Sequence, residues 1–92
     1  MTLELFKNGN KEIYTTFFIS GMMFRNALQI QRKLENNKFT VELLDELIGF
    51  VCNVFNNQFT VNEFYEGIDR KDIFKISNDI LAKVISGDYD TH

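Results

Sequence analysis

The chain has 92 residues, enough for one domain, and folding at this size removes only about two-thirds of the unfolded surface from water. A stable core therefore needs nearly every large side chain. With 45% hydrophobic residues, 25% charged residues, ten Phe, three Tyr and no Pro, the composition is that of an ordered globular domain. The net charge of −3 argues against nucleic-acid binding, which needs an excess of Lys and Arg to displace counterions from phosphates.

The sequence carries no mark of export or of a membrane span. Residues 1–6 lack the charged and long apolar blocks of a signal peptide, and no apolar run approaches the roughly 20 residues that cross a bilayer. The single cysteine, Cys52, cannot form an internal disulfide. Because it lies within an apolar run, we expect a buried and unreactive thiol.

Charge is distributed unevenly along the chain. Residues 1–38 hold six basic and three acidic side chains, whereas residues 39–92 hold four basic and ten acidic ones. Such asymmetry is common on a solvated surface, and it also provides complementary ends for head-to-tail association between copies. Both interpretations stay open.

Two β-prone runs at the N-terminus predict a hairpin, over residues 3–7 and 11–17, around Asn8-Gly9-Asn10. The register is not decided. A three-residue loop opposes Lys7 and Lys11, while a Gly9-Asn10 turn pairs Lys7 with Glu12. The three-residue loop would place these apolar or β-branched residues on one face: Leu3, Leu5, Ile13, Thr15 and Phe17. Because two strands alone are marginal in water, the hairpin must pack on helices or on another subunit.

Two amphipathic helices are predicted after the hairpin. Ser20 caps a helix that runs to about Glu35, and Thr40 opens a second helix that runs to about Asn56. The second helix is apolar around most of its circumference. We therefore place it at the centre of a small bundle rather than at a surface offered to a partner.

The run from residue 59 to residue 64 is the sharpest local signal. Thr60 and Glu63 fit a capping box, and Phe59 and Phe64 fit a hydrophobic staple around it. Together they predict the start of a short helix. Gly67 follows this helix and can adopt the left-handed conformation that closes it.

A last helix is predicted from Asp69, which acts as the N-cap with Asp72 in the first turn, to Gly87, which acts as the stop. Residues 88–92 form a polar tail that we expect to be mobile. The predicted fold class is therefore mainly α (α+β), with an N-terminal β-hairpin over residues 1–18 and a bundle of about four helices over residues 20–87. The whole chain, 1–92, is predicted to form a single domain.

The sequence offers no convincing catalytic constellation. His92, the only histidine, is the last residue, so no Ser-His or Cys-His pair can be placed on rigid elements. Asp88, Asp90 and His92 make a weak candidate metal site in the tail. The turn at residues 8–10 has neither G-x-G-x-x-G spacing nor the Lys of a P-loop. We predict no enzyme, no cofactor and no metal site.

The aromatic residues point to protein partners. Most of the ten Phe fall at positions assigned to core faces or staples, without the interleaved Lys and Arg of a nucleic-acid platform. Ten Phe nevertheless exceed what so small a domain can hide. We expect Met22, Met23 and Phe24 at a helix start, with Phe39 and the hairpin edge, to bind a partner or a second copy.

The segment from residue 50 to residue 69 carries the pattern F-V-x-x-x-F-x-N-Q-F-T-x-x-x-x-x-x-G-I-D. Its residues of interest are Asn57, Gln58, Phe59, Thr60, Glu63, Gly67 and Asp69. Helix capping explains part of the pattern but does not demand Asn57-Gln58, and we expect all seven to be mainly structural. With the preceding strand and helix, the segment resembles the tail assembly chaperones of long-tailed phages and prophages of Gram-positive bacteria.

The resemblance covers most of the chain. It implies a small, non-catalytic protein of the host bacterial cytoplasm that binds the tape measure protein, helps to recruit the major tail protein, and is absent from the finished virion. A longer form made by frameshift often accompanies such proteins. An acidic domain with surplus Phe and Met suits reversible masking of a long, apolar, helical client, and we expect a homo-oligomer.

Two other functions are compatible with the sequence. One is a DNA-binding or anti-repressor protein of a phage or mobile element, because the helices around Gly67 look like a helix-turn-helix. A gel shift at low salt tests this alternative, and the acidic second half of the chain opposes it. The other is an enzyme with a metal site in the tail, which metal titration with and without residues 88–92 would test.

Overall fold

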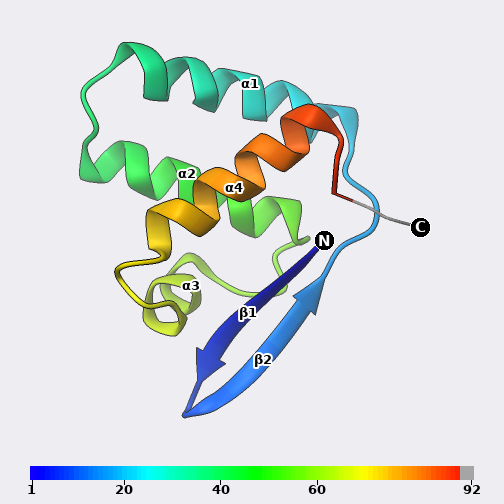
Figure 1. Ribbon diagram of the computed structural model, residues 1–92, viewed down its shortest axis with the longest axis vertical. Coiled ribbons are helices and arrows are strands. Elements are labelled where there is room, and N and C mark those ends of the chain that lie inside the picture. The colour runs from blue at the N-terminus through cyan, green and yellow to red at the C-terminus, as the bar shows by residue number, and fades with distance from the viewer. Residues whose placement is uncertain (90–92) are drawn as a thin grey trace.

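The computed structural model describes residues 1–89, which form a β-hairpin followed by four helices (Figure 1). The strands are β1 (Thr2–Lys7) and β2 (Asn10–Thr15). The helices are α1 (Gly21–Asn36), α2 (Val41–Val54), α3 (Val61–Gly67) and α4 (Ile73–Ser86). The predicted mainly α class with an N-terminal hairpin is confirmed. The end of the predicted mobile tail, residues 90–92, lies outside the described residues.

The hairpin turns at Asn8 and Gly9, whose φ angles are 53° and 80°. Positive φ at both central residues is typical of the type I′ turn, which suits the twist of paired strands and favours Asn-Gly. Lys7 therefore pairs with Asn10, and Leu5 pairs with Glu12. Both registers expected from the sequence are wrong, because the three-residue loop included Asn10 in the turn and the Gly9-Asn10 turn lay one residue too far along the chain.

This register decides which side chains of the hairpin reach the core. Leu3 and Leu5 are buried against the helices, and the Tyr14 ring packs on the Phe59 ring with 4.9 Å between centroids. Alternation along the strands turns Phe6 and Ile13 outward, where they are 59% and 61% exposed. The expectation that Ile13 shares the buried face with Leu3 and Leu5 is therefore wrong.

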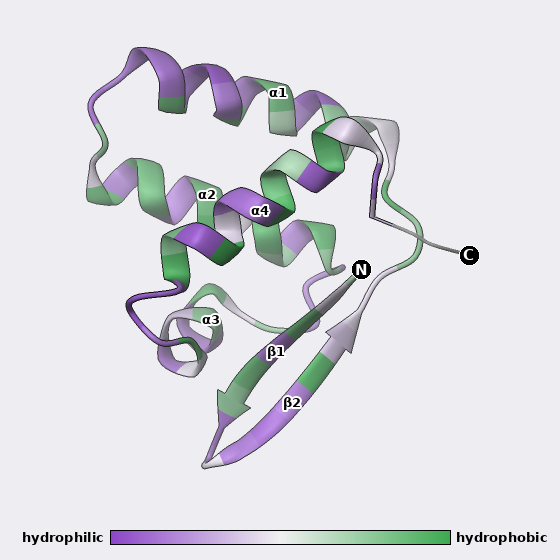
Figure 2. Cartoon of the chain, viewed as in Figure 1, coloured by the Kyte–Doolittle hydropathy of each residue, from purple (hydrophilic) through white to green (hydrophobic). Residues whose placement is uncertain are grey.

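Helix α2 lies in the middle of the molecule and contacts α1, α3 and α4. In Figure 2 much of α2 is coloured hydrophobic, whereas α1 at the edge of the bundle is largely hydrophilic. The central position predicted for this helix is confirmed. Its buried side chains span most of its circumference: Leu43, Leu47, Ile48, Phe50, Val51, Cys52 and Val54.

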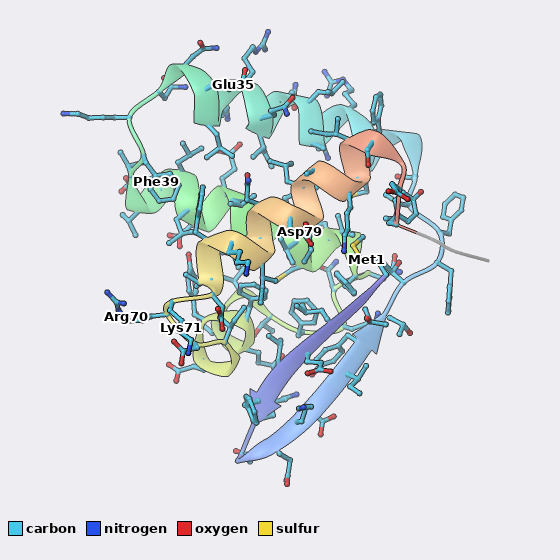
Figure 3. The ribbon with its side chains drawn as sticks, in the orientation of Figure 1. Met1, Glu35, Phe39, Arg70, Lys71 and Asp79 are labelled. Carbon is cyan, nitrogen blue, oxygen red and sulfur yellow. The ribbon has the colours of Figure 1, made fainter. Side chains whose placement is uncertain are left out.

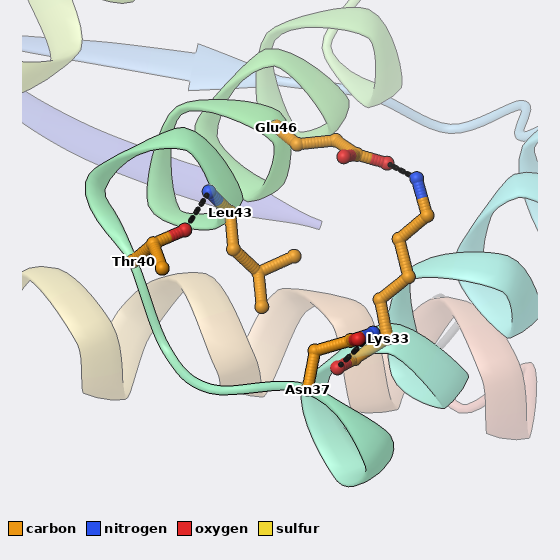
Figure 4. A network of polar contacts seen from close by, with 5 residues as sticks. All are labelled: Lys33, Asn37, Thr40, Leu43 and Glu46. Atoms are coloured by element: carbon orange, nitrogen blue, oxygen red, sulfur yellow. Dashed lines mark hydrogen bonds and ion pairs between the residues drawn. The ribbon is translucent and has the colours of Figure 1, made fainter.

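Polar contacts fix the connection between α1 and α2 (Figure 4). The Asn37 side-chain amide donates to the Lys33 carbonyl oxygen at 3.2 Å, and the Lys33 ammonium lies 2.8 Å from the Glu46 carboxylate. The Thr40 hydroxyl accepts a hydrogen bond from the Leu43 amide at 3.2 Å, as expected for an N-cap. These contacts stabilise the end of α1 and the start of α2.

Helix α4 begins three residues later than the sequence predicts. The Asp69 carboxylate accepts a hydrogen bond from the Lys71 amide at 3.0 Å, and the Asp69 carbonyl accepts one from the Asp72 amide at 2.9 Å. These bonds form a turn over residues 69–72, so Asp69 is not the N-cap. Asp72 holds that position without a side-chain capping bond. Gly87 stops α4 with φ 78°, as predicted.

Candidate protein-binding surface

Six of the ten Phe side chains are exposed, and only four are buried. The buried ones are Phe50, Phe55, Phe59 and Phe64; the exposed ones are Phe6, Phe17, Phe18, Phe24, Phe39 and Phe74. The expectation that most Phe belong to core faces or staples is therefore wrong. So many exposed aromatic rings on so small a protein are typical of a surface that contacts other proteins.

Four of the large exposed apolar side chains lie close together in the sequence, and we name them the aromatic surface: Phe17, Phe18, Met22 and Phe24. Phe18, at 79%, and Phe17, at 68%, are the most exposed of them. They lie in the connection from β2 to α1, which Figure 2 shows as hydrophobic although it runs along the outside of the molecule. Met22 and Phe24 follow in the first turn of α1.

The segment that carries the aromatic surface is anchored at both ends. Thr16 is buried, exchanges backbone hydrogen bonds with Met1 at 2.9 and 3.0 Å, and donates its hydroxyl to the Phe18 carbonyl at 3.5 Å. The Ser20 hydroxyl accepts from the Met23 amide at 3.3 Å and caps α1, as predicted. The exposed rings are thus held on a defined backbone.

Met23 does not belong to this surface. It is half-buried and packs against the core, because it lies on the same side of α1 as the buried Ala27 and Ile30. Of the predicted trio at the helix start, only Met22 and Phe24 are exposed.

The structure does not bring Phe39 to the aromatic surface. Phe39 lies in the connection after α1 (Figure 3), and the part of that helix between Met22 and Asn36 is roughly 21 Å long. Its ring packs edge-on against Phe74 of α4, with 5.2 Å between centroids. Phe39 and Phe74 therefore form a second, separate exposed pair.

Sequence reasoning missed Phe17, Phe18 and Phe74 as exposed side chains. A signal existed for the first two, since adjacent residues after a strand point to opposite sides and cannot both face one core. Phe74 carried no such signal. The helical periodicity assigns it to the apolar face together with its neighbour Ile73, and in the structure Ile73 packs against the core whereas Phe74 does not.

Asn56 and Asn57 end α2 in left-handed conformations, with φ 59° and 57°. The Asn57 amide donates to the Cys52 carbonyl at 2.8 Å and the Asn56 amide to the Asn53 carbonyl at 3.0 Å, which is the bonding of a Schellman motif. Asn takes the place that Gly usually holds, and α2 ends two residues earlier than expected. These bonds give Asn57, a member of the pattern over residues 50–69, a structural role.

Gln58 binds one end of the outer edge of the hairpin. Its side-chain amide donates to the Thr15 carbonyl and to the Phe55 carbonyl, both at 2.9 Å. Thr15 belongs to a non-hydrogen-bonded pair of the ladder, so its carbonyl points away from β1. Gln58 thus ties the outer edge of β2 to the end of α2, which helix capping alone did not explain.

The predicted capping box and staple are both present. The Thr60 hydroxyl accepts from the Glu63 amide at 3.1 Å, and the Glu63 carboxylate accepts from the Thr60 amide at 2.8 Å. The Phe59 and Phe64 rings stack with 6.1 Å between centroids. Glu63 also pairs with Lys7 of β1 at 2.9 Å, and this ion pair, followed by the Thr60 bond, lowers the pKa of the Glu63 carboxyl.

Gly67 has a different role from the one predicted. It has no positive φ and is the last residue of α3. A Cβ at this position would lie 2.8 Å from the Phe6 carbonyl oxygen and 3.0 Å from the Leu5 Cβ. Glycine is needed here because α3 contacts the backbone of β1, not because the helix closes in a left-handed conformation.

Two groups with raised pKa values, Cys52 and Tyr65, have structural roles. Burial raises the pKa of the Cys52 thiol to about 11, which keeps it protonated and unreactive at neutral pH. Burial, and then the hydrogen bond from the Tyr65 hydroxyl to the Asp45 carboxylate at 2.6 Å, raises the pKa of Tyr65. Within residues 1–89, His, Cys, Asp and Glu side chains do not gather in a group of three that would suit a metal ion. Two members of the candidate metal site, Asp90 and His92, lie outside this range.

Within the part of the chain that the structure describes, no helix is both long and apolar enough to cross a membrane. Comparison with protein families gives a match over residues 1–92 to the family described as phage tail chaperone protein. The searches of curated proteins and of solved structures returned no match. The family match spans the hairpin, the aromatic surface and the residue pattern around Gln58 and Gly67. The chain therefore belongs to the phage tail chaperone protein family.

Proposed function

We propose that this protein binds the tape measure protein during phage tail assembly and keeps its apolar segments apart until the tail tube forms around them. The observation that carries the proposal is the aromatic surface, whose four large apolar side chains are exposed on an anchored segment. Phe and Met adapt to irregular apolar surfaces, and a chaperone for a long helical client needs such contacts. The protein acts without catalysis, in the cytoplasm of the bacterial host.

The proposal includes two further partners. Copies of the chain associate with one another, and the major tail protein is a second client. Support comes from the unequal charge of the two parts of the chain and from the second exposed pair, Phe39 and Phe74. Nucleic acid is not among the proposed partners, since the net charge of −3 opposes contact with phosphates.

Coexpression with the tape measure protein tests the proposal. In the variant Phe18→Ser with Phe24→Ser we expect the affinity for the tape measure protein to fall about tenfold or more, because two apolar side chains that binding would bury are lost. Copurification and isothermal titration with soluble fragments of the tape measure protein measure the loss. Circular dichroism should stay nearly unchanged, because both side chains are exposed.

A matched control removes the same kind of side chain elsewhere. Ile13 and Val41 are 61% and 63% exposed and lie outside the aromatic surface, so Ile13→Ser with Val41→Ser should keep the affinity. Equal losses in the two double variants, or full binding by Phe18→Ser with Phe24→Ser, would refute the aromatic surface as the client site.

A further inference from the structure

A groove of about 440 Å³ runs between the outer face of β1 and one side of α4. Its apolar lining includes Phe6, Ile68 and Ile76, and its charged lining includes Asp72, Asp79 and Lys83. Figure 3 shows Asp79 on the side of α4 that faces the start of β1, near Met1. The groove therefore combines apolar side chains with an excess of carboxylates.

The carboxylates that line the groove are incompletely neutralised. Asp79 pairs with Lys83 at 3.2 Å, four residues along α4. Asp69 and Asp72, which also line the groove, make no ion pair with the side chains of residues 1–89. A partner that covers this groove must supply positive charge, since burying unpaired carboxylates is costly.

One side of α4 repeats an acid, an apolar residue and an acid over two turns. Asp72, Ile76 and Asp79 stand at positions i, i+4 and i+7, so they share one side of the helix and line the groove together. The two carboxylates are roughly 10 Å apart along the helix axis. We name this set the acidic row.

Helix α1 carries the complementary pattern on its solvent side. Arg25, Leu28 and Arg32 stand at positions i, i+3 and i+7. Leu28 is 42% exposed, and the two guanidinium groups are exposed and form no ion pair with the side chains of residues 1–89. The spacing between the charges equals that of the acidic row. We name this set the basic row.

The two rows match when the helices run antiparallel. Arg25 then opposes Asp79, Leu28 opposes Ile76, and Arg32 opposes Asp72, because three and then four residues separate the members of each row in this direction. We propose that the basic row of one copy docks in the groove of a second copy, beside its acidic row. This contact deepens the proposed association between copies and does not involve the client.

The contact is heterologous, since each copy uses one surface to receive and a different one to dock. Every added copy leaves a basic row free at one end and a groove free at the other, so association continues head to tail. Neither row contains a member of the aromatic surface. An assembly of many copies would therefore carry one aromatic surface on each copy.

Sedimentation velocity of the protein alone, over a range of concentration and salt, tests the contact. We expect reversible association that weakens as salt rises, since the paired charges are solvent-accessible. Arg32→Asp, or Asp72→Arg, should each weaken association about tenfold or more, because each places like charges opposite one another. Leu28→Ser should weaken it without a change in charge.

The double variant Arg32→Asp with Asp72→Arg restores opposite charges between neighbouring copies and should recover association. Lys38→Asp and Glu42→Arg, which make the same changes of charge outside the two rows, serve as controls and should associate as the unmodified protein does. Monomers at all concentrations, association unaffected by Arg32→Asp, or a double variant as weak as the single ones would overturn the proposal. Because no client is present, none of these results bears on binding of the tape measure protein.

Discussion

Gly49 and Gly67 both lie within helices, yet an added methyl group would meet different surroundings. At Gly67 the Cβ would lie 2.8 Å from the Phe6 carbonyl oxygen, whereas at Gly49 no atom beyond the chain neighbours and the local helix backbone would lie within 4 Å. The sequence alone does not separate the two positions, because the close contact joins residues that are about sixty positions apart. Only the packing of α3 on β1 distinguishes them.

We expect opposite effects of alanine at the two glycines. Gly67→Ala should lower the free energy of unfolding by about 1–3 kcal/mol, because α3 must move away from β1. Gly49→Ala should raise it by about 0.5–1 kcal/mol, because alanine favours the helix and has room. Urea unfolding followed by circular dichroism measures both. A stabilising Gly67→Ala would show that α3 and β1 are not in contact there.

At the scale of elements, the sequence predicts those helix boundaries that hydrogen bonds between neighbouring residues determine. Ser20, Thr40 and Thr60 were identified as N-caps from sequence, and each accepts the expected backbone hydrogen bond. The start of α4 was not predicted, because Asp69 uses its carboxylate in a turn that precedes the helix. In a turn and in a helix N-cap alike, the Asp69 carboxylate accepts a hydrogen bond from a backbone amide that follows it. The sequence therefore does not choose between the two arrangements.

Glu63 links α3 to the hairpin, and acid should weaken this link. Its pKa is lowered in the folded state by Lys7 and then by the Thr60 amide, so its contribution to stability is present above the unfolded pKa of about 4.3 and is lost as pH falls through the folded pKa. Glu63→Gln should therefore make the urea midpoint less sensitive to pH between about pH 7 and about pH 3. Glu66→Gln, in the same helix, should leave that sensitivity unchanged. If both variants keep the full acid sensitivity, the ion pair with Lys7 does not contribute to stability.

Across the whole molecule, hairpin and helices share one set of buried contacts. Leu3 and Leu5 of β1 pack in the same cluster as side chains of all four helices. The sequence predicted that the hairpin needs such support, but not which of its two faces would be covered, because that depends on the register. For the same reason the exposure of Phe6 was not predicted. The class of fold is thus readable from periodicity, whereas the exposed surface follows from tertiary packing.

Leu5→Ala should destabilise the entire molecule. Leu5 is fully buried, so the substitution should cost about 2–5 kcal/mol of unfolding free energy, and amide hydrogen exchange should speed up in α2 as well as in β1. Ile13→Ala, on the outward face of β2, should change stability by no more than about 0.5 kcal/mol. Faster exchange confined to the hairpin in Leu5→Ala would mean that the hairpin unfolds independently of the helices.

Tyr14, whose ring packs against Phe59, provides an intrinsic fluorescence probe of the fold. The chain contains no tryptophan, so tyrosine emission is not masked. Tyr14 joins the hairpin to the segment between α2 and α3, while Tyr65 donates to a carboxylate of α2. Tyr14 should therefore report the docking of the hairpin, and Tyr65 the docking of α3 on α2. Stopped-flow fluorescence of single Tyr→Phe variants can then time the docking of the hairpin without any attached dye.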